Sequence, residues 1–386
     1  MSRNVVALGG VSFLTDVATE MIYPLLPLFL STVLGANASF IGAIEGTAES
    51  IAALLKLASG WWSDKVRKRK PLVVIGYGIA TVARPFTAIA QTAVQVLAIR
   101  VTDRVGKGIR SAPRDALLAD STDDESRGRA FGFHAAMDNA GAVLGPLIAF
   151  LLLRQLDLSL RHVFWMAAIP GALAFLVLVI AVKEVEHKEL PSSSEAHLDT
   201  KQKLGGRFWY YIGIVFLFTL GNSTDAFLLL RANQLGVAVA LAPILWAFLN
   251  LIKAALGTWG GSLSDRFGRK PLIIAGWTVY AVVYFGFAVA TAEWHAWALF
   301  ASYGLFYAFT EGTEKAFVAD LIPQARRGAA FGWYNLAIGL GALPASLIFG
   351  AIWDRVGPHA AFLFGASLAI LASLGMFFVA PQRRTI

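Results

Sequence analysis

Twelve apolar segments, each of about twenty residues or more, follow one another along this chain of 386 residues. A helix of about 20 apolar residues is long enough to cross the hydrocarbon core of a bilayer. The chain is 57% hydrophobic and only 15% charged, whereas soluble domains carry about 25% charged residues. The sequence therefore predicts an all-α membrane protein. The predicted spans are 5–34, 38–62, 71–91, 93–115, 128–153, 162–182, 208–231, 238–262, 271–292, 295–318, 328–352 and 359–380, of which 93–115 and 295–318 carry several charges.

A polar stretch at 183–207 separates the first six segments from the last six and has the composition of a flexible linker. We therefore predict an N-terminal six-helix bundle at 1–182, a linker at 183–207 and a C-terminal six-helix bundle at 208–386. Basic residues gather in the linker, in every second loop and at the chain end, whereas the intervening loops are nearly uncharged. Because cytoplasmic loops are the ones rich in Lys and Arg, we expect both termini to be cytoplasmic, in a multi-pass protein of the inner membrane.

An internal repeat supports the two-bundle organisation. The stretch 119–142 contains the elements AD, RG, AFG and GA, which recur at the same spacing in 319–342. Parallel duplication of a six-span unit predicts a pseudo-twofold axis along the membrane normal, with a cavity between the two halves.

A ten-residue motif links the chain to a known family. The stretch 261–270 (GSLSDRFGRK) resembles the G-x-L-x-D-R-x-G-R-K signature of the major facilitator superfamily, and it lies between the eighth and ninth segments, as in that family. The stretch 60–70 (GWWSDKVRKRK) is a looser counterpart, and residues 350–357 contain a further echo. The resemblance implies the major facilitator fold, with twelve transmembrane helices in two pseudo-symmetric six-helix bundles.

The same resemblance implies that the motif latches the outward-facing state. Small residues let helices approach closely, and a carboxylate accepts hydrogen bonds from a helix N-terminus. Alternatively, the basic run only fixes the topology. The predicted latch consists of Gly60, Asp64, Lys65, Gly261, Asp265, Arg266, Gly268 and Arg269.

Two carboxylates, Asp16 and Glu20, stand four residues apart in the first apolar segment and so share one helical face. A charge at mid-membrane costs about 2.5–3.5 kcal/mol on insertion scales and is usually retained for a function. Burial favours the protonated form of a carboxyl group, which suits a site that takes up and releases protons. Alternatively, both acids are structural and are paired with a basic neighbour. Arg100 is the expected partner, unless it pairs with Asp103 on its own helix.

Further polar residues inside the segments extend the set of candidates. Glu45 and Glu49 also stand four apart, and Glu45 lies close enough to the outer mouth to be simply solvated. His134 and Asp138 form a pair that can titrate near neutral pH, or that only supports packing. The candidate coupling or substrate-binding residues are Asp16, Glu20, Glu45, Glu49, Arg100, Asp103, His134, Asp138, Asp225 and Glu311.

A charge inversion between the halves suggests a gate. Arg114 and Asp115 correspond in the repeat to Glu314 and Lys315, so the order of charges is reversed. These residues either pair across the two halves or stay within their own half.

The sequence thus predicts a secondary active transporter that exports a small organic solute in exchange for protons. The alternatives are H⁺- or Na⁺-coupled transport of an anion, sugar or metal chelate and, in another class, a non-transporting membrane sensor. We find no protease, hydrolase or Walker A motif, so we predict no enzyme, no cofactor and no metal site, with an ion gradient as the energy source. The net charge of +8 lies in short loops, which favours contact with the lipid bilayer over binding of nucleic acid. We expect a monomer.

Overall fold

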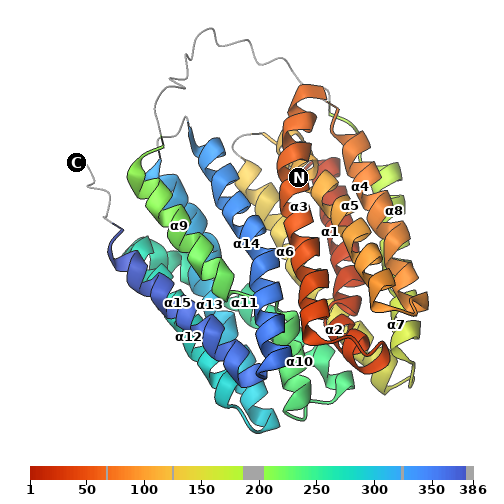
Figure 1. The fold of residues 1–386 in the computed structure, drawn as a ribbon. Coiled ribbons are helices and arrows are strands. Elements are labelled where there is room, and N and C mark those ends of the chain that lie inside the picture. The colour runs from red at the N-terminus through yellow and green to blue at the C-terminus, as the bar shows by residue number, and fades with distance from the viewer. Residues whose placement is uncertain (67, 124–125, 186–203, 323–325, 380–386) are drawn as a thin grey trace.

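The computed structural model describes residues 1–66, 68–123, 126–185, 204–322 and 326–379. Helices make up nearly all of this part of the chain, and no strand occurs within it (Figure 1). The α-helices are α1 (Arg3–Ile22), α2 (Leu26–Leu28), α3 (Ala38–Val66), α4 (Lys70–Ala83), α5 (Ala93–Asp120), α6 (Arg127–Arg154), α7 (Leu160–Met166), α8 (Ala168–Ala181), α9 (Gly206–Gly221), α10 (Ala226–Gln234), α11 (Ala242–Phe267), α12 (Arg269–Val289), α13 (Glu293–Leu321), α14 (Arg327–Arg355) and α15 (Pro358–Phe377).

Ten helical stretches of the described chain are long and apolar enough to cross a bilayer. The two remaining long helices, α5 and α13, carry the charged segments that the sequence analysis singled out, and they are 28 and 29 residues long. They lie beside their neighbours like the other long helices (Figure 1). The prediction of an all-α membrane fold is confirmed, and the helices are consistent with twelve spans.

One interruption inside a span positions a candidate residue. Helix α9 ends at Gly221, and the backbone of Asn222 leaves the helical region before α10 begins at Ala226. Asp225 therefore stands at a break within the span rather than on a continuous helix. Irregular backbone at membrane depth is tolerated where it is buried in protein or lines a cavity.

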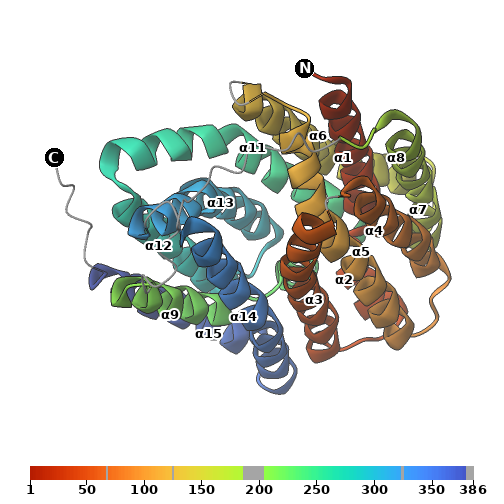
Figure 2. The same cartoon turned by 90° about the horizontal axis from the view of Figure 1, so that it is seen from above.

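The helices up to α8 pack mainly among themselves, and so do those from α9 onward (Figure 2). Helix α8 ends and α9 begins at the same end of the molecule as the N-terminus, and we call this the linker end (Figure 1). The opposite end, where α3 begins and α14 ends, is the far end. Most of the predicted linker lies outside the described residues. Two helix pairs, α3 with α14 and α6 with α11, form the main contacts between the halves.

Glycines allow α3 and α14 to touch backbone to backbone. A Cβ atom at Gly46 would lie 2.9 Å from the Cα of Leu343, and one at Gly350 would lie 2.7 Å from the Cα of Ser39. These positions extend from mid-membrane to the far end of the pair, so the halves are closely packed there. Small residues are what permits such an approach in a membrane.

A carboxylate also joins the two halves at the far end. Asp354, near the end of α14, accepts hydrogen bonds from the backbone N–H groups of Ala38 (3.0 Å) and Ser39 (2.8 Å), at the start of α3. A helix N-terminus leaves four N–H groups without partners inside the helix, and a negative charge there is favourable. We call this contact the far-end clasp.

Candidate functional site

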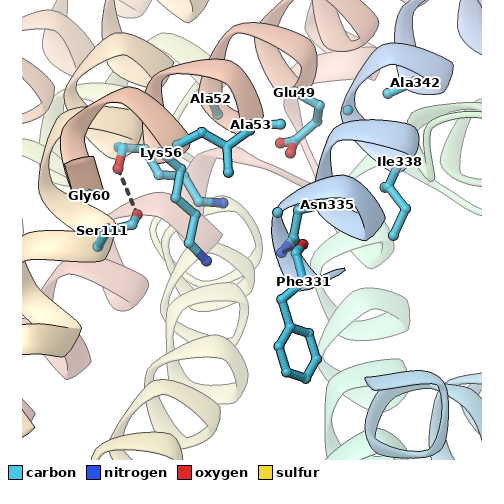
Figure 3. Close-up of a pocket in the computed structure, with 15 residues that line it drawn as sticks. Glu49, Ala52, Ala53, Lys56, Gly60, Ser111, Phe331, Asn335, Ile338 and Ala342 are labelled. Carbon is cyan, nitrogen blue, oxygen red and sulfur yellow. Dashed lines mark hydrogen bonds between the residues drawn. The ribbon is translucent and has the colours of Figure 1, made fainter. Parts of the chain in front are cut away.

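A cavity of about 420 Å³ lies between the halves, on the linker-end side of the α3–α14 contact (Figure 3). Its first wall carries Glu49 and Lys56 from α3, together with Lys107 and Ser111 from α5. Its opposite wall is α14, with Phe331, Asn335 and Ile338 among the lining residues. Ligand sites usually enclose about 300–1,000 Å³, so the cavity is large enough for a small organic molecule.

The two acids of α1 are held by the neighbouring helix α6. A Cβ atom at Gly141 would lie 2.6 Å from the Phe13 carbonyl oxygen, and one at Gly145 would lie 2.7 Å from the Val17 carbonyl oxygen. Both glycines thus face α1 beside Asp16 and Glu20. The glycines of α6 therefore pack α1 tightly at the level of its two carboxylates.

Glu20 connects the two halves of the molecule. The indole Nε1–H of Trp246, on α11, donates a hydrogen bond of 2.7 Å to the Glu20 carboxylate. The Tyr23 ring packs on the same indole, with 4.9 Å between the ring centroids. No basic group of the described chain lies within 4 Å of the carboxylate of Glu20 or of Asp16, in contrast to the expectation that Arg100 pairs with them.

His134 and Asp138 meet on α6 as the sequence spacing predicts. The His134 Nδ1 atom lies 3.4 Å from the Asp138 carboxylate, and the His134 side chain is buried. Asp138 lies close enough to Asp16 for their negative charges to repel each other. This second group of titratable side chains is therefore adjacent to the acids of α1.

Arg100 makes its ion pairs with other acids. Its guanidinium donates two hydrogen bonds to the Glu45 carboxylate, from Nε at 2.9 Å and from Nη2 at 2.6 Å, and it lies 3.8 Å from Asp103. The bidentate geometry is the strongest form of such a pair. Glu45 is only 3% exposed, so the expectation that it is solvated at the outer mouth is wrong. Its burial is explained by Arg100, which satisfies both of its oxygens.

Asp103 is the centre of the charged network in the first half. Arg84 donates to it from Nε at 2.8 Å, and Arg104 does so from Nη1 at 3.3 Å. Arg104 also lies 3.2 Å from Glu49, whose side chain is 48% exposed toward the cavity. Sequence reasoning missed Arg84 and Arg104, since only the tertiary packing brings them to their partners.

Acids of the second half are bound by aromatic donors instead. The Asp225 carboxylate accepts hydrogen bonds from the hydroxyl groups of Tyr303 (2.7 Å) and Tyr307 (2.9 Å). The ammonium group of Lys253 lies 3.8 Å from the centre of the Tyr307 ring. Glu311, by contrast, is exposed. Asp225 is thus the candidate of this half that lies in a defined polar site.

The suggested gate residues stay within their own halves in this conformation. Arg114 donates to its neighbour Asp115 at 2.8 Å. Glu314 accepts from the Trp277 indole (2.8 Å) and the Tyr334 hydroxyl (2.6 Å). Lys315 is exposed. Of the two alternatives, this structure has the one without pairing across the halves.

At the linker end, the described charged residues of the predicted latch are exposed to solvent or form ion pairs within their own half. Asp265 and Arg266 are exposed, whereas Arg269 pairs with Asp320 of the same half at 2.5 Å. The equivalent residue of the first half, Arg69, pairs in the same way with Asp120.

Two details of the motif need correction or restriction. The close helix contact of α11 lies at Gly260, against Ala308, and not at Gly261, which has open space around it. Gly60 touches only Ala112, and the Lys65 ammonium lies 5.2 Å from the Trp61 ring. Gly268 has a φ of 91°, a conformation that favours glycine, and it ends α11. The side chain of Asp64 lies outside the described residues.

Within the described part of the chain, no three His, Cys, Asp or Glu side chains are placed to hold a metal ion. The polar groups of the cavity are ammonium, carboxylate, hydroxyl and amide groups. The arrangement can bind a solute and exchange protons.

Two helical halves, a cavity between them and glycine-mediated contacts between the halves form the architecture of a membrane transporter. The family model of the Major Facilitator Superfamily matches residues 8–346, and the chain belongs to this superfamily. An uncharacterized MFS-type transporter of Methanocaldococcus jannaschii is 35% identical over 388 residues, which cover 98% of this chain and 95% of that one. The chain is therefore a multi-pass membrane protein with the fold of transporters.

Two other similarities are more limited. The class B tetracycline resistance protein of Escherichia coli is 31% identical over 147 residues, or 38% of this chain and 34% of that one. The crystal structure of a D-xylose–proton symporter superimposes with a TM-score of 0.79 at 18% identity, covering 98% of this chain and 97% of that one. The latter supports the fold alone.

Proposed function

We propose that this protein is a proton-coupled exporter, a monomer of the inner membrane that moves a small organic solute out of the cytoplasm by alternating access. The observation that carries the proposal is the environment of Asp16 and Glu20. Both acids lie on α1, Glu20 bonds to Trp246 of the other half, and no basic side chain of the described chain lies within 4 Å of either carboxylate. An intramembrane carboxylate without a counter-ion is most stable when it is protonated, and it loses its proton when water reaches it.

The contact with Trp246 supplies the link between proton and conformation. Glu20 belongs to the first half and Trp246 to the second, so their hydrogen bond depends on how the halves are placed. A hydrogen bond to a carboxylate is roughly twice as strong as one to a neutral acceptor. Proton binding at Glu20 therefore weakens a tie between the halves.

Export rather than uptake is favoured by two observations. The run of Gly141, Gly145 and Pro146 on α6 is similar to the fifth-span motif of antiporters of the superfamily. The partial relative from Escherichia coli bears the name of a drug resistance protein.

Loop charges favour cytoplasmic termini, so the cavity in this conformation opens toward the cytoplasm.

The test is gradient-driven flux in proteoliposomes, with a solute identified by screening an overexpressing strain against toxic compounds. We expect Glu20→Gln, and Asp16→Asn combined with it, to lose transport driven by a pH gradient and to keep exchange of labelled for unlabelled solute. Asp157→Asn, a change of the same kind in a loop, is the matched control.

Full gradient-driven flux in the double variant would end the assignment of coupling to α1. A complete lack of flux in the parent protein would instead favour a membrane sensor. Flux that follows a Na⁺ gradient but ignores a pH gradient would favour the Na⁺-coupled alternative.

A further inference from the structure

The cavity between the halves has an uneven charge distribution. Its lining contains one acid, Glu49, and two bases, Lys56 and Lys107. Glu49 is already paired with Arg104, at 3.2 Å. Neither lysine has a carboxylate within 4 Å among the described residues, and both are exposed to the cavity. Glu49 has an ion pair at contact distance and neither ammonium group has one, although the charges of Glu49 and Asp16 also act on Lys107, so the first wall carries a net positive charge.

The opposite wall has a different chemistry. It is formed by α14, where Phe331 and Ile338 present apolar surface and Asn335 presents an amide (Figure 3). Figure 3 shows Lys56 pointing into the space between α3 and α14. The lining is thus cationic on the wall from the first half and mostly apolar on the wall from the second half.

A ligand that satisfies both walls carries an anionic group at one end and an apolar body at the other. We propose that the transported solute is an amphipathic organic anion, with its carboxylate, sulfonate or phosphate between Lys56 and Lys107 and its apolar part against Phe331 and Ile338. This inference rests on the proposed transport function and specifies its substrate class. Ser111, whose hydroxyl bonds to the Lys107 carbonyl oxygen at 2.6 Å, lies beside the anionic end.

The proposal has an electrical consequence. If an anion leaves while a proton enters, each of the two movements makes the inside of the cell more positive by one charge. Export would then be accelerated by an inside-negative membrane potential as well as by a pH gradient. Export of a neutral solute for one proton would move half as much charge in each cycle.

The first test measures the charge of the cavity without any substrate. The chain contains no cysteine, so Asn335→Cys places a single thiol at the cavity wall. This thiol is treated with two reagents of opposite charge, the anion sulfonatoethyl methanethiosulfonate and the cation trimethylammonioethyl methanethiosulfonate. The two reaction rates are compared with those of Gln155→Cys, which lies outside the cavity. We expect the ratio of the anion rate to the cation rate at Asn335→Cys to be about tenfold or more above the same ratio at Gln155→Cys. The ammonium charges of Lys56 and Lys107 attract the anionic reagent and repel the cationic one through a low effective dielectric.

Removing the two charges should abolish this preference. Adding Lys56→Gln and Lys107→Gln should return the ratio to that of the reference thiol, whereas Lys183→Gln, at an exposed site outside the cavity, should not change it. An unchanged ratio in the double variant would overturn the proposal. A thiol that neither reagent reaches would overturn it too, since no solute could then enter.

The second test measures binding of three probes with the same apolar body. Phenylbutyrate, phenylbutanol and phenylbutylamine share a phenyl ring on a four-carbon chain and differ in the terminal group, which is an anionic carboxylate, a neutral hydroxyl or a cationic ammonium group. We expect phenylbutyrate to bind about tenfold or more tightly than the other two, because hydrogen bonds to charged groups are the stronger ones. Lys56→Gln with Lys107→Gln should remove this advantage, and Lys56→Arg with Lys107→Arg should keep most of it. Equal binding of the three probes, or no saturable binding of phenylbutyrate at millimolar concentration, would contradict the assignment.

The two proposals fail separately. Neither test requires transport, so a cationic cavity with normal gradient-driven flux in the Glu20→Gln and Asp16→Asn variant would leave the substrate class standing and remove the coupling site. Uncoupling by those variants, together with equal binding of the three probes, would leave the coupling site standing and remove the substrate class.

Discussion

Glu45 and Arg100 form a bidentate ion pair in the first half, whereas the positions 200 residues later in the repeat are the buried apolar residues Leu245 and Phe300. The same replacement occurs one turn further along. Asp103 is an ion-paired acid, and its counterpart Tyr303 is a neutral hydrogen-bond donor. Equivalent positions on the same fold thus hold charge in one half and aromatic surface in the other.

The repeat is preserved at its linker end and has diverged in the middle of the membrane. Arg69 with Asp120 and Arg269 with Asp320 make equivalent ion pairs. At mid-membrane the second half instead stacks its rings, for example Tyr280 on Tyr284 with centroids 4.1 Å apart. The comparison teaches that a duplicated fold keeps the ion pairs at its linker end, while the buried polar positions at mid-membrane specialise.

The energetic consequences of the two solutions differ. Removing one partner of a buried ion pair leaves a charge without compensation, at a cost of about 3–5 kcal/mol. Removing one hydroxyl donor from a carboxylate costs about 1.5–3 kcal/mol. The first half should therefore be the more sensitive one to single substitutions at its polar core.

The largest expected effect is that of Asp103→Ala. It leaves Arg84 and Arg104 without their common acceptor, so we expect a loss of about 3–5 kcal/mol in the free energy of unfolding. Tyr303→Phe, at the equivalent position, removes one of two hydrogen bonds to the Asp225 carboxylate and should lose about 1.5–3 kcal/mol. Reversible unfolding in mixed detergent measures both, and equal losses would break the comparison between the halves.

An intermediate effect is expected at the far end, where the halves again differ in charge. Asp354 closes the clasp on α3, and its counterpart in the repeat is Arg154. Asp354→Ala should weaken the far-end clasp by about 0.5–2 kcal/mol. The fraction of molecules that are open at the far end should therefore increase.

Electron–electron distance measurements can follow this shift, because a pair of introduced thiols, one in each half at the far end, can be spin-labelled selectively in a chain without cysteine. Longer distances across the far end are expected in Asp354→Ala and not in Arg154→Ala. An unchanged distribution in the first variant would mean that the clasp does not control the opening.

The smallest net effect is expected when two residues of the first half are replaced by their counterparts in the second half. Glu45→Leu combined with Arg100→Phe replaces an ion pair by apolar side chains, a change that is often neutral or stabilising in buried sites. We expect unfolding free energies within about 1 kcal/mol of the parent protein for the double variant and losses of about 3–5 kcal/mol for each single one. A double variant no more stable than the singles would show that the ion pair cannot be exchanged for packing.

The sequence predicted the fold because its signals are local or periodic. Span length, loop charge and the repeat at 119–142 and 319–342 each act over short stretches. The segments 93–115 and 295–318 were also predicted as spans, and the helices found there, α5 and α13, are 28 and 29 residues long, which is consistent with that prediction. The distinction between Gly260 and Gly261 was lost because it depends on the rotation of α11 against α13.

The candidate site was predicted less completely. Spacing placed Asp16 and Glu20 on one face, which is a property of a single helix. Their surroundings are tertiary, as in the bond between Glu20 and Trp246, residues 226 positions apart. The sequence offered Asp16, Glu20 and Asp103 as partners of Arg100, and only the packing of α3 against α5 brings Glu45 to it.

The packing of Gly141 and Gly145 against α1 has a consequence for the timing of transport. The glycines of α6 hold α1 in close backbone contact, so we expect Glu20 to move with the whole first half and its bond to Trp246 to break when the halves rearrange. That bond is thus part of the activation barrier and not only of the resting structure. Since protonation of Glu20 weakens it, the proton that drives the exchange would also lower this barrier, and so set how fast the carrier returns after releasing its cargo rather than how tightly it holds that cargo.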